Sequence, residues 1–151
     1  MNGVLVPVWW IADRDIVISK KVLKAVLNPI SVGARLASHV RKARAFRDGA
    51  AQVDEPGLRV EAWFLSAYHF IEACPAKRRV HIQKHQRVPD ELKRNPSILG
   101  PKTSVVVDAF RYLDHNARVK FVYGNSGTRA DLAKARKSFE AIVSICEAVL
   151  A

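Results

Sequence analysis

The segment 102–150 carries two runs of apolar residues with helical spacing, and this periodicity constrains the fold more than any other feature of the chain. In each run the apolar residues recur at intervals of three and four, which places them on one face of an α-helix. The first run contains Val106, Ala109, Phe110, Leu113, Ala117 and Phe121, and the second contains Leu132, Ala135, Phe139, Ile142, Val143, Cys146 and Val149. A Tyr-Gly-Asn-Ser-Gly turn at 123–127 separates them, so we expect two helices that bury these faces.

The second of these helices has a clear start signal. Thr128 is followed three residues later by Asp131, which fits a capping box with Asp in the position that Glu usually holds. We therefore expect the last helix to begin near Thr128.

Two further helices are expected earlier in the chain. The first covers about 31–51, where apolar residues at helical spacing lie opposite a group of arginines and lysines. The second follows the break at 54–57, where Asp54 can cap the first amides and Pro56 fits the first turn. Pro75 marks its expected end, near Cys74.

Between Pro75 and Pro101 the apolar pattern loosens, and this region is expected to hold one short helix flanked by irregular chain. Cations crowd its first half and form a candidate binding surface: Lys77, Arg78, Arg79, His81, Lys84, His85 and Arg87. His81 and His85 lie four residues apart, as metal ligands on a helix do. No cysteine or acidic residue with ligand spacing accompanies this pair, so we expect neither a metal site nor a cofactor.

Four helices with apolar stripes and short connections predict an all-α fold, an antiparallel bundle of four to five helices. Residues 1–30 do not fit this pattern and are interpreted as an N-terminal arm or extension, short, extended or irregular, before a helical domain at 31–151. Cys74 and Cys146 occupy apolar-face positions, which indicates buried thiols in a reducing compartment.

The chain is strongly basic, with 25 Lys and Arg against 14 Asp and Glu and a formal charge of +11. Such a charge favours polyanionic partners such as nucleic acid or an acidic protein, although a merely basic protein would have the same composition. The apolar run 4–12 is too short to span a bilayer and lacks the features of a secretory signal. We therefore expect a cytoplasmic protein without a membrane partner.

Polar residues on the helix that precedes the turn suggest the kind of ligand. Asp108, Arg111, His115 and Arg118 recur at intervals of three and four, opposite the apolar face. A row of charged and titratable groups on a basic chain favours a ligand that carries phosphate.

Three short runs resemble motifs of the HEPN superfamily (higher eukaryotes and prokaryotes nucleotide-binding). The run 66–73 with Tyr68 is similar to its second helix, and the run 84–88 with His85 is similar to its short Lys/Ser-His motif. The run 116–124 is similar to its late motif, in which an arginine is followed, after about four to six residues, by a histidine or, in some subfamilies, a tyrosine. Here Arg118 is followed by Tyr123, which matches the tyrosine-bearing pattern.

The resemblance implies a helical bundle that dimerises and binds RNA or a nucleotide. Members of the superfamily include metal-independent ribonucleases of toxin–antitoxin and defence systems, so a cognate antitoxin is an expected partner. In such an enzyme Arg118 would hold the scissile phosphate, and Tyr123, His115 or His85 would transfer protons. The cations expected to bind nucleic acid are Arg111, Lys120, Arg78, Arg79, Lys84 and Arg87.

The residues themselves leave other interpretations open. Arg118 can pair with Asp108, Asp114 or a carboxylate of a neighbouring helix, because arginine serves in ion pairs as often as in phosphate sites. Tyr123 can simply pack at a helix end, and it is a poor base at neutral pH. The competing function is a non-catalytic basic helical subunit that binds nucleic acid or a protein within a larger assembly.

Overall fold

The computed structural model describes residues 32–77 and 80–151 of the chain. The expected N-terminal arm at 1–30 and the predicted contact residues Arg78 and Arg79 lie outside these residues.

The described part is all-helical. Its elements are α2 (Val32–Gln52), α3 (Pro56–Ala76), α4 (Val88–Arg94), α5 (Thr103–Arg111), a π-helical turn (Tyr112–Ala117), α6 (Arg118–Phe121) and α7 (Arg129–Leu150), with short 3₁₀ turns at His85–Arg87 and Gly100–Lys102. The stretch 103–121 is one continuous helix with a π-helical turn inside it. Counted in this way, the residues that the structure describes form five helices and no strand, which confirms the predicted fold class.

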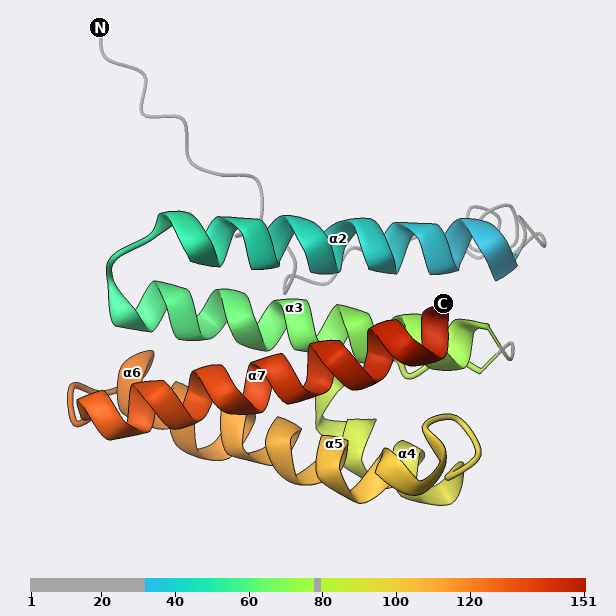
Figure 1. Ribbon diagram of the computed structural model, residues 1–151. Coiled ribbons are helices and arrows are strands. Elements are labelled where there is room, and N and C mark those ends of the chain that lie inside the picture. The colour runs from blue at the N-terminus through green and yellow to red at the C-terminus, as the bar shows by residue number, and fades with distance from the viewer. Residues whose placement is uncertain (1–31, 78–79) are drawn as a thin grey trace, which may run out of the picture. The chain divides into compact units, whose positions relative to one another are not determined.

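The long helices alternate in direction along the chain (Figure 1). Figure 1 shows α2 and α3 side by side and antiparallel, with α7 crossing in front between α3 and the 103–121 helix. The short α4 packs on α5. The core between these helices contains the fully buried side chains of Phe64, Phe70, Ile71, Phe110, Leu113 and Ile142. The apolar seams that the sequence displays are thus the surfaces through which the helices pack.

The predicted start of the last helix is confirmed. The Thr128 hydroxyl accepts a hydrogen bond from the Asp131 backbone N–H at 3.1 Å, and the Asp131 carboxylate accepts one from the Thr128 backbone N–H at 3.0 Å. Both halves of the capping box are therefore present.

The predicted cap of α3 is wrong by one residue. Glu55, and not Asp54, accepts hydrogen bonds from the backbone N–H groups of Gly57 and Leu58, at 3.0 and 2.6 Å. These bonds lower the pKa of the Glu55 carboxyl below its usual value. Asp54 lies one residue too early to reach these amides, and its exposed carboxylate lies 3.7 Å from Arg59 Nη2 instead.

The two cysteines are buried with free thiols, as their positions on apolar faces predict. Pro75 sits inside the last turn of α3, which ends one residue later at Ala76. Among the described helices, none is both long and apolar enough to cross a membrane.

Candidate functional site around Arg118

Arg118 lies where the π-helical turn ends and α6 begins. A π-helical turn is wider than an α-helical one, so it shifts the direction of every residue that follows it. Asp108, Arg111 and His115 are exposed, whereas the Arg118 side chain is only 13 % exposed and packs against α3. The predicted polar stripe is therefore exposed from Asp108 to His115, inside the π-helical turn, and does not continue to Arg118.

Two carboxylates hold the Arg118 guanidinium. Its Nε and Nη2 donate to the two carboxylate oxygens of Glu61 on α3, at 2.8 and 3.1 Å. Its Nη1 donates to Asp114 Oδ1 at 2.9 Å, one turn earlier in the same helix. This geometry is the bidentate arrangement that fits a planar guanidinium best.

Aromatic rings complete the environment of this arginine. The guanidinium carbon lies 4.0 Å from the centroid of the buried Phe64 ring and 5.4 Å from that of Tyr123. Burial lowers the pKa of Arg118, but the hydrogen bonds and the negative charge of Glu61 and Asp114 outweigh it, so that the pKa lies above its usual value. Arg118 is thus a permanent cation between two anions and two rings.

Tyr123 extends the cluster to the surface. Its hydroxyl accepts a hydrogen bond from Arg118 Nη2 at 2.9 Å, and the residue is 69 % exposed. The arginine and the tyrosine of the predicted late motif are therefore in direct contact. The exposed hydroxyl of Tyr123 is hydrogen-bonded to the largely buried guanidinium of Arg118.

The two candidate histidines lie on different sides of this cluster. His115 is exposed, and its Nε2 lies 4.0 Å from Asp114 Oδ2, so the two belong to one surface. The His85 ring packs edge-on against Phe64, with 5.4 Å between the ring centroids. Phe64 therefore contacts both Arg118 and His85.

Of the predicted nucleic-acid contacts, Arg111, Lys84 and Arg87 are exposed. Lys120 is not available in the same way, because its ammonium lies 2.7 Å from Asp131 Oδ1. Arg111 lines an open groove of about 680 Å³ between the 103–121 helix and α7. The charged residues of this groove are Asp108, Arg111, Lys134 and Lys137.

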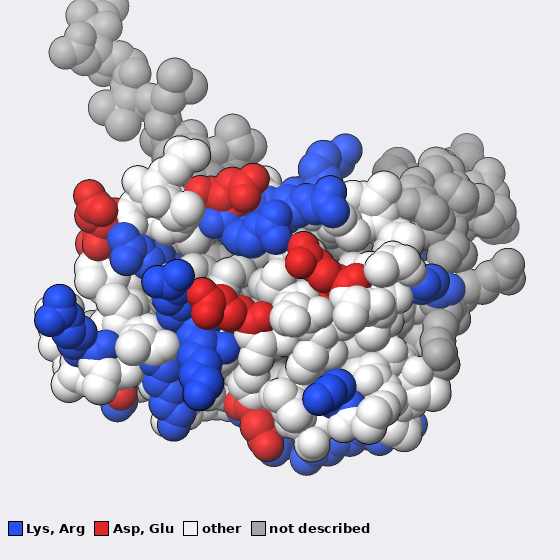
Figure 2. Space-filling view, viewed as in Figure 1, with Lys and Arg blue, Asp and Glu red and all other residues white. Residues whose placement is uncertain are grey.

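A second and larger groove, of about 820 Å³, runs between α3, the end of α2 and α7. Its arginines are mostly engaged by the protein itself. Arg47 pairs with Glu147 at 3.0 Å and Arg136 with Glu140 at 2.8 Å, while Arg59 donates to the backbone carbonyl of Val53. On the face shown in Figure 2, lysine and arginine side chains gather in a band toward the lower left, with carboxylates interspersed.

Three residues that matter at these two sites were not predicted, namely Glu61, Lys134 and Lys137. Glu61 holds Arg118 from 57 residues away, and no local spacing signals such a contact. Lys134 and Lys137 lie three residues apart on α7 and so share a face, which was visible in the sequence. Only the packing of α7 beside Arg111 turns them into one surface.

Comparisons with family models, with curated proteins and with solved structures gave no match. The HEPN resemblance therefore remains a prediction that rests on the three short runs. The helical fold that this resemblance implies agrees with the described helices.

Proposed function

We propose that this protein binds RNA, and that the groove between the 103–121 helix and α7 holds the phosphate backbone. The observation that carries this proposal is the composition of the groove, which sets three cations against one carboxylate. Arg111, Lys134 and Lys137 are all exposed, so their charges are accessible to a polyanion.

Charge pairing favours this groove over the larger one. Among the described residues, no carboxylate lies within ion-pair distance of Arg111, Lys134 or Lys137. The Lys134 ammonium instead lies 4.5 Å from the centroid of the Tyr112 ring. A phosphate entering here displaces no salt bridge, whereas in the larger groove it competes with Glu140 and Glu147. Counterion release then contributes directly to affinity.

The experiment compares two triple variants that remove the same charge. Arg111→Ala/Lys134→Ala/Lys137→Ala removes the groove cations, and Arg41→Ala/Arg44→Ala/Lys93→Ala removes three exposed cations from α2 and α4. Affinity for a fluorescent single-stranded RNA is measured by anisotropy. The groove variant is expected to lose at least about tenfold in affinity and the control variant much less. Equal losses would mean that RNA is held by the overall charge and not by this groove.

A second candidate function is cleavage of RNA, and the hydrogen bond between Arg118 and the exposed Tyr123 favours it. In this function the Tyr123 hydroxyl would donate a proton or orient a phosphate, and Arg118 would neutralise charge in the transition state. The two carboxylates of Glu61 and Asp114 argue against cleavage. Together they outweigh the charge of Arg118, and the net negative charge of the cluster repels a phosphate. The resting geometry thus supports binding better than cleavage.

Cleavage is tested by incubating RNA with the protein in the presence of a chelator. Tyr123→Phe removes the hydroxyl of an exposed side chain and leaves the fold in place, so it is the informative variant. A metal-independent ribonuclease of this design loses activity in Tyr123→Phe and keeps it in the control Tyr68→Phe, because the Tyr68 hydroxyl donates to the Ile82 carbonyl and does not line the groove. Activity that survives unchanged in Tyr123→Phe removes that hydroxyl from the mechanism, and absence of cleavage by the wild type rejects this function.

We also propose that the protein is a homodimer through the end of the 103–121 helix. Three exposed apolar side chains gather there, those of Val119, Val122 and Tyr123, next to the Arg118 cluster. Dimerisation of HEPN-like bundles would bury this patch and join two clusters in one cleft. Sedimentation of the wild type and of Val119→Lys tests this: the wild type is expected to be a dimer and the variant a monomer.

A further inference from the structure

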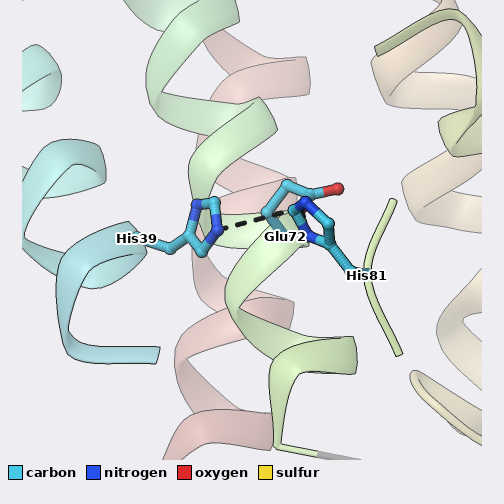
Figure 3. Close-up of side chains that lie close together, drawn as sticks. All are labelled: His39, Glu72 and His81. Carbon is cyan, nitrogen blue, oxygen red and sulfur yellow. Dashed lines mark ion pairs between the residues drawn. The ribbon is translucent and has the colours of Figure 1, made fainter. Parts of the chain in front are cut away.

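Three side chains from three separate segments converge at one end of the α2–α3 pair, away from the Arg118 cluster. Figure 3 shows His39 reaching from α2 toward Glu72 on α3, with His81 on the other side, from the chain that follows α3. One ligand atom of each residue lies within 4.8 Å of the others. Residues 39, 72 and 81 have no common local spacing, so only the fold brings them together.

The distances in this cluster suit a small cation. Glu72 Oε2 lies 3.0 Å from His81 Nδ1 and 3.9 Å from His39 Nε2. Ligand atoms about 2.0–2.2 Å from a tetrahedral Zn²⁺ lie about 3.3 Å from one another. The two distances lie on either side of that value, and the ligand atoms of His39 and His81 lie within 4.8 Å of one another, so the three side chains must draw slightly together to share one ion.

Glu72 is the most unusual member of the cluster. It is fully buried in an otherwise apolar stretch of α3, and neither carboxylate oxygen has a hydrogen bond of good geometry within the described residues. A buried carboxylate whose nearest polar neighbours are two imidazoles and which lacks a hydrogen bond in the described part of the chain is costly, and a bound cation is one of the few groups that compensates it.

His69 holds the His39 ring in the orientation that a ligand needs. The two Nδ1 atoms lie 3.1 Å apart, and the His69 ring stacks on Phe46 with an interplanar angle of 4°. Because a hydrogen bond between two imidazole nitrogens contains one proton, His39 can donate through Nδ1 and leave Nε2 free of a proton and directed at Glu72. Metal-ligating histidines are commonly fixed by such a second hydrogen bond.

We propose that His39, Glu72 and His81 form a binding site for a divalent transition metal of the Zn²⁺ class. Two imidazoles and one carboxylate are a ligand set that Zn²⁺ accepts, and three protein ligands leave a fourth position for water. The site is independent of the proposed RNA groove, since it shares no residue with it. His81 is 45 % exposed, so the cluster has an opening to solvent through this residue.

The experiment uses the full chain without an added histidine tag. After treatment with a chelator, the protein is titrated with Zn²⁺ against a chromogenic chelator, and thermal unfolding is followed with and without Zn²⁺. We expect one Zn²⁺ per chain and a higher unfolding temperature with the metal, because a ligand that binds only the folded state stabilises it.

Two histidine variants decide where the metal binds. His81→Asn changes a half-exposed side chain and leaves the core intact, and His115→Asn is the control, because His115 is an exposed histidine outside the cluster. The affinity for Zn²⁺ is expected to fall at least about tenfold in His81→Asn and to stay unchanged in His115→Asn. Absence of binding by the wild type, or equal behaviour of the two variants, overturns the proposal.

Discussion

Arg118 Nη2 donates a hydrogen bond of 2.9 Å to the Tyr123 hydroxyl, so the two residues of the late motif touch one another. The contact depends on the end of α6, where the backbone N–H groups of Val122 and Tyr123 both donate to the Arg118 carbonyl and turn the chain back. The same guanidinium is held from behind by Glu61 and Asp114. Arg118 therefore both joins α3 to α6 through its ion pairs and contacts the candidate catalytic hydroxyl of Tyr123.

Replacing Arg118 is expected to destabilise the protein strongly. Arg118→Ala leaves Glu61 and Asp114 partly buried without their counter-ion, which should cost about 3 kcal/mol of unfolding free energy. Arg94→Ala is the control, because Arg94 pairs with Glu91 at the surface, and it should cost under about 1 kcal/mol. Urea unfolding of both variants checks this, and equal costs would show that the Arg118 pairs contribute no more than a surface pair.

Two helical glycines should respond in opposite directions to alanine. A Cβ atom at Gly57 would lie 2.5 Å from the backbone carbonyl oxygen of Phe121, so Gly57→Ala should destabilise by about 1–3 kcal/mol. A Cβ atom at Gly49, inside α2, meets nothing within 4 Å, so Gly49→Ala should stabilise by about 0.5–1 kcal/mol. Urea unfolding measures both midpoints; a midpoint of Gly57→Ala that does not fall would contradict the close approach of α3 and α6.

The fall of the unfolding free energy at alkaline pH should depend on Tyr68. Its hydroxyl donates to the Ile82 carbonyl at 3.3 Å, and burial, with a contribution from the charge of Glu72, raises the pKa of Tyr68 from 10.0 to about 12. The unfolded chain loses this proton near the ordinary pKa, so it binds fewer protons than the folded chain between these values. Stability must therefore fall as the pH rises through this window.

Tyr68→Phe isolates the contribution of the Tyr68 hydroxyl to the pH dependence of stability, because the lysines titrate alike in the wild type and in the variant. The wild type should be more stable than the variant at about pH 8, and its advantage should shrink as the pH approaches about 11. Denaturant unfolding at several pH values measures the difference. A difference that stays constant would mean that Tyr68 ionises as readily in the folded protein as in the unfolded chain.

Local patterns predicted the helices well, because the residues that define a helix are its own neighbours. Thr128 and Asp131 are three residues apart and form the capping box, and the apolar faces of α3 and α7 are the buried ones. The π-helical turn before Arg118 was not predicted, since nothing in the spacing of its residues signals an added residue in the turn. It is this turn that shifts Arg118 away from the predicted stripe.

The sites depend on contacts between distant segments and were correspondingly harder to predict. The Arg118–Tyr123 contact spans five residues and was foreseen as a motif, but the Glu61 partner lies on another helix. His81 was considered with His85 as a metal pair, whereas its neighbours are His39 and Glu72. A glutamate inside the apolar stretch 70–74 was the signal that could have indicated a buried ligand or ion pair.

The salt dependence of RNA binding tests the central claim most directly. The association constant for a single-stranded RNA is measured from about 50 to about 200 mM salt for the wild type and for Arg111→Ala/Lys134→Ala/Lys137→Ala. Each phosphate contact on a single strand contributes about −0.7 to the slope of log K against log salt, so the slope of the variant should be shallower by about 2. Equal slopes for the two proteins would contradict the assignment of the groove as the phosphate-binding surface.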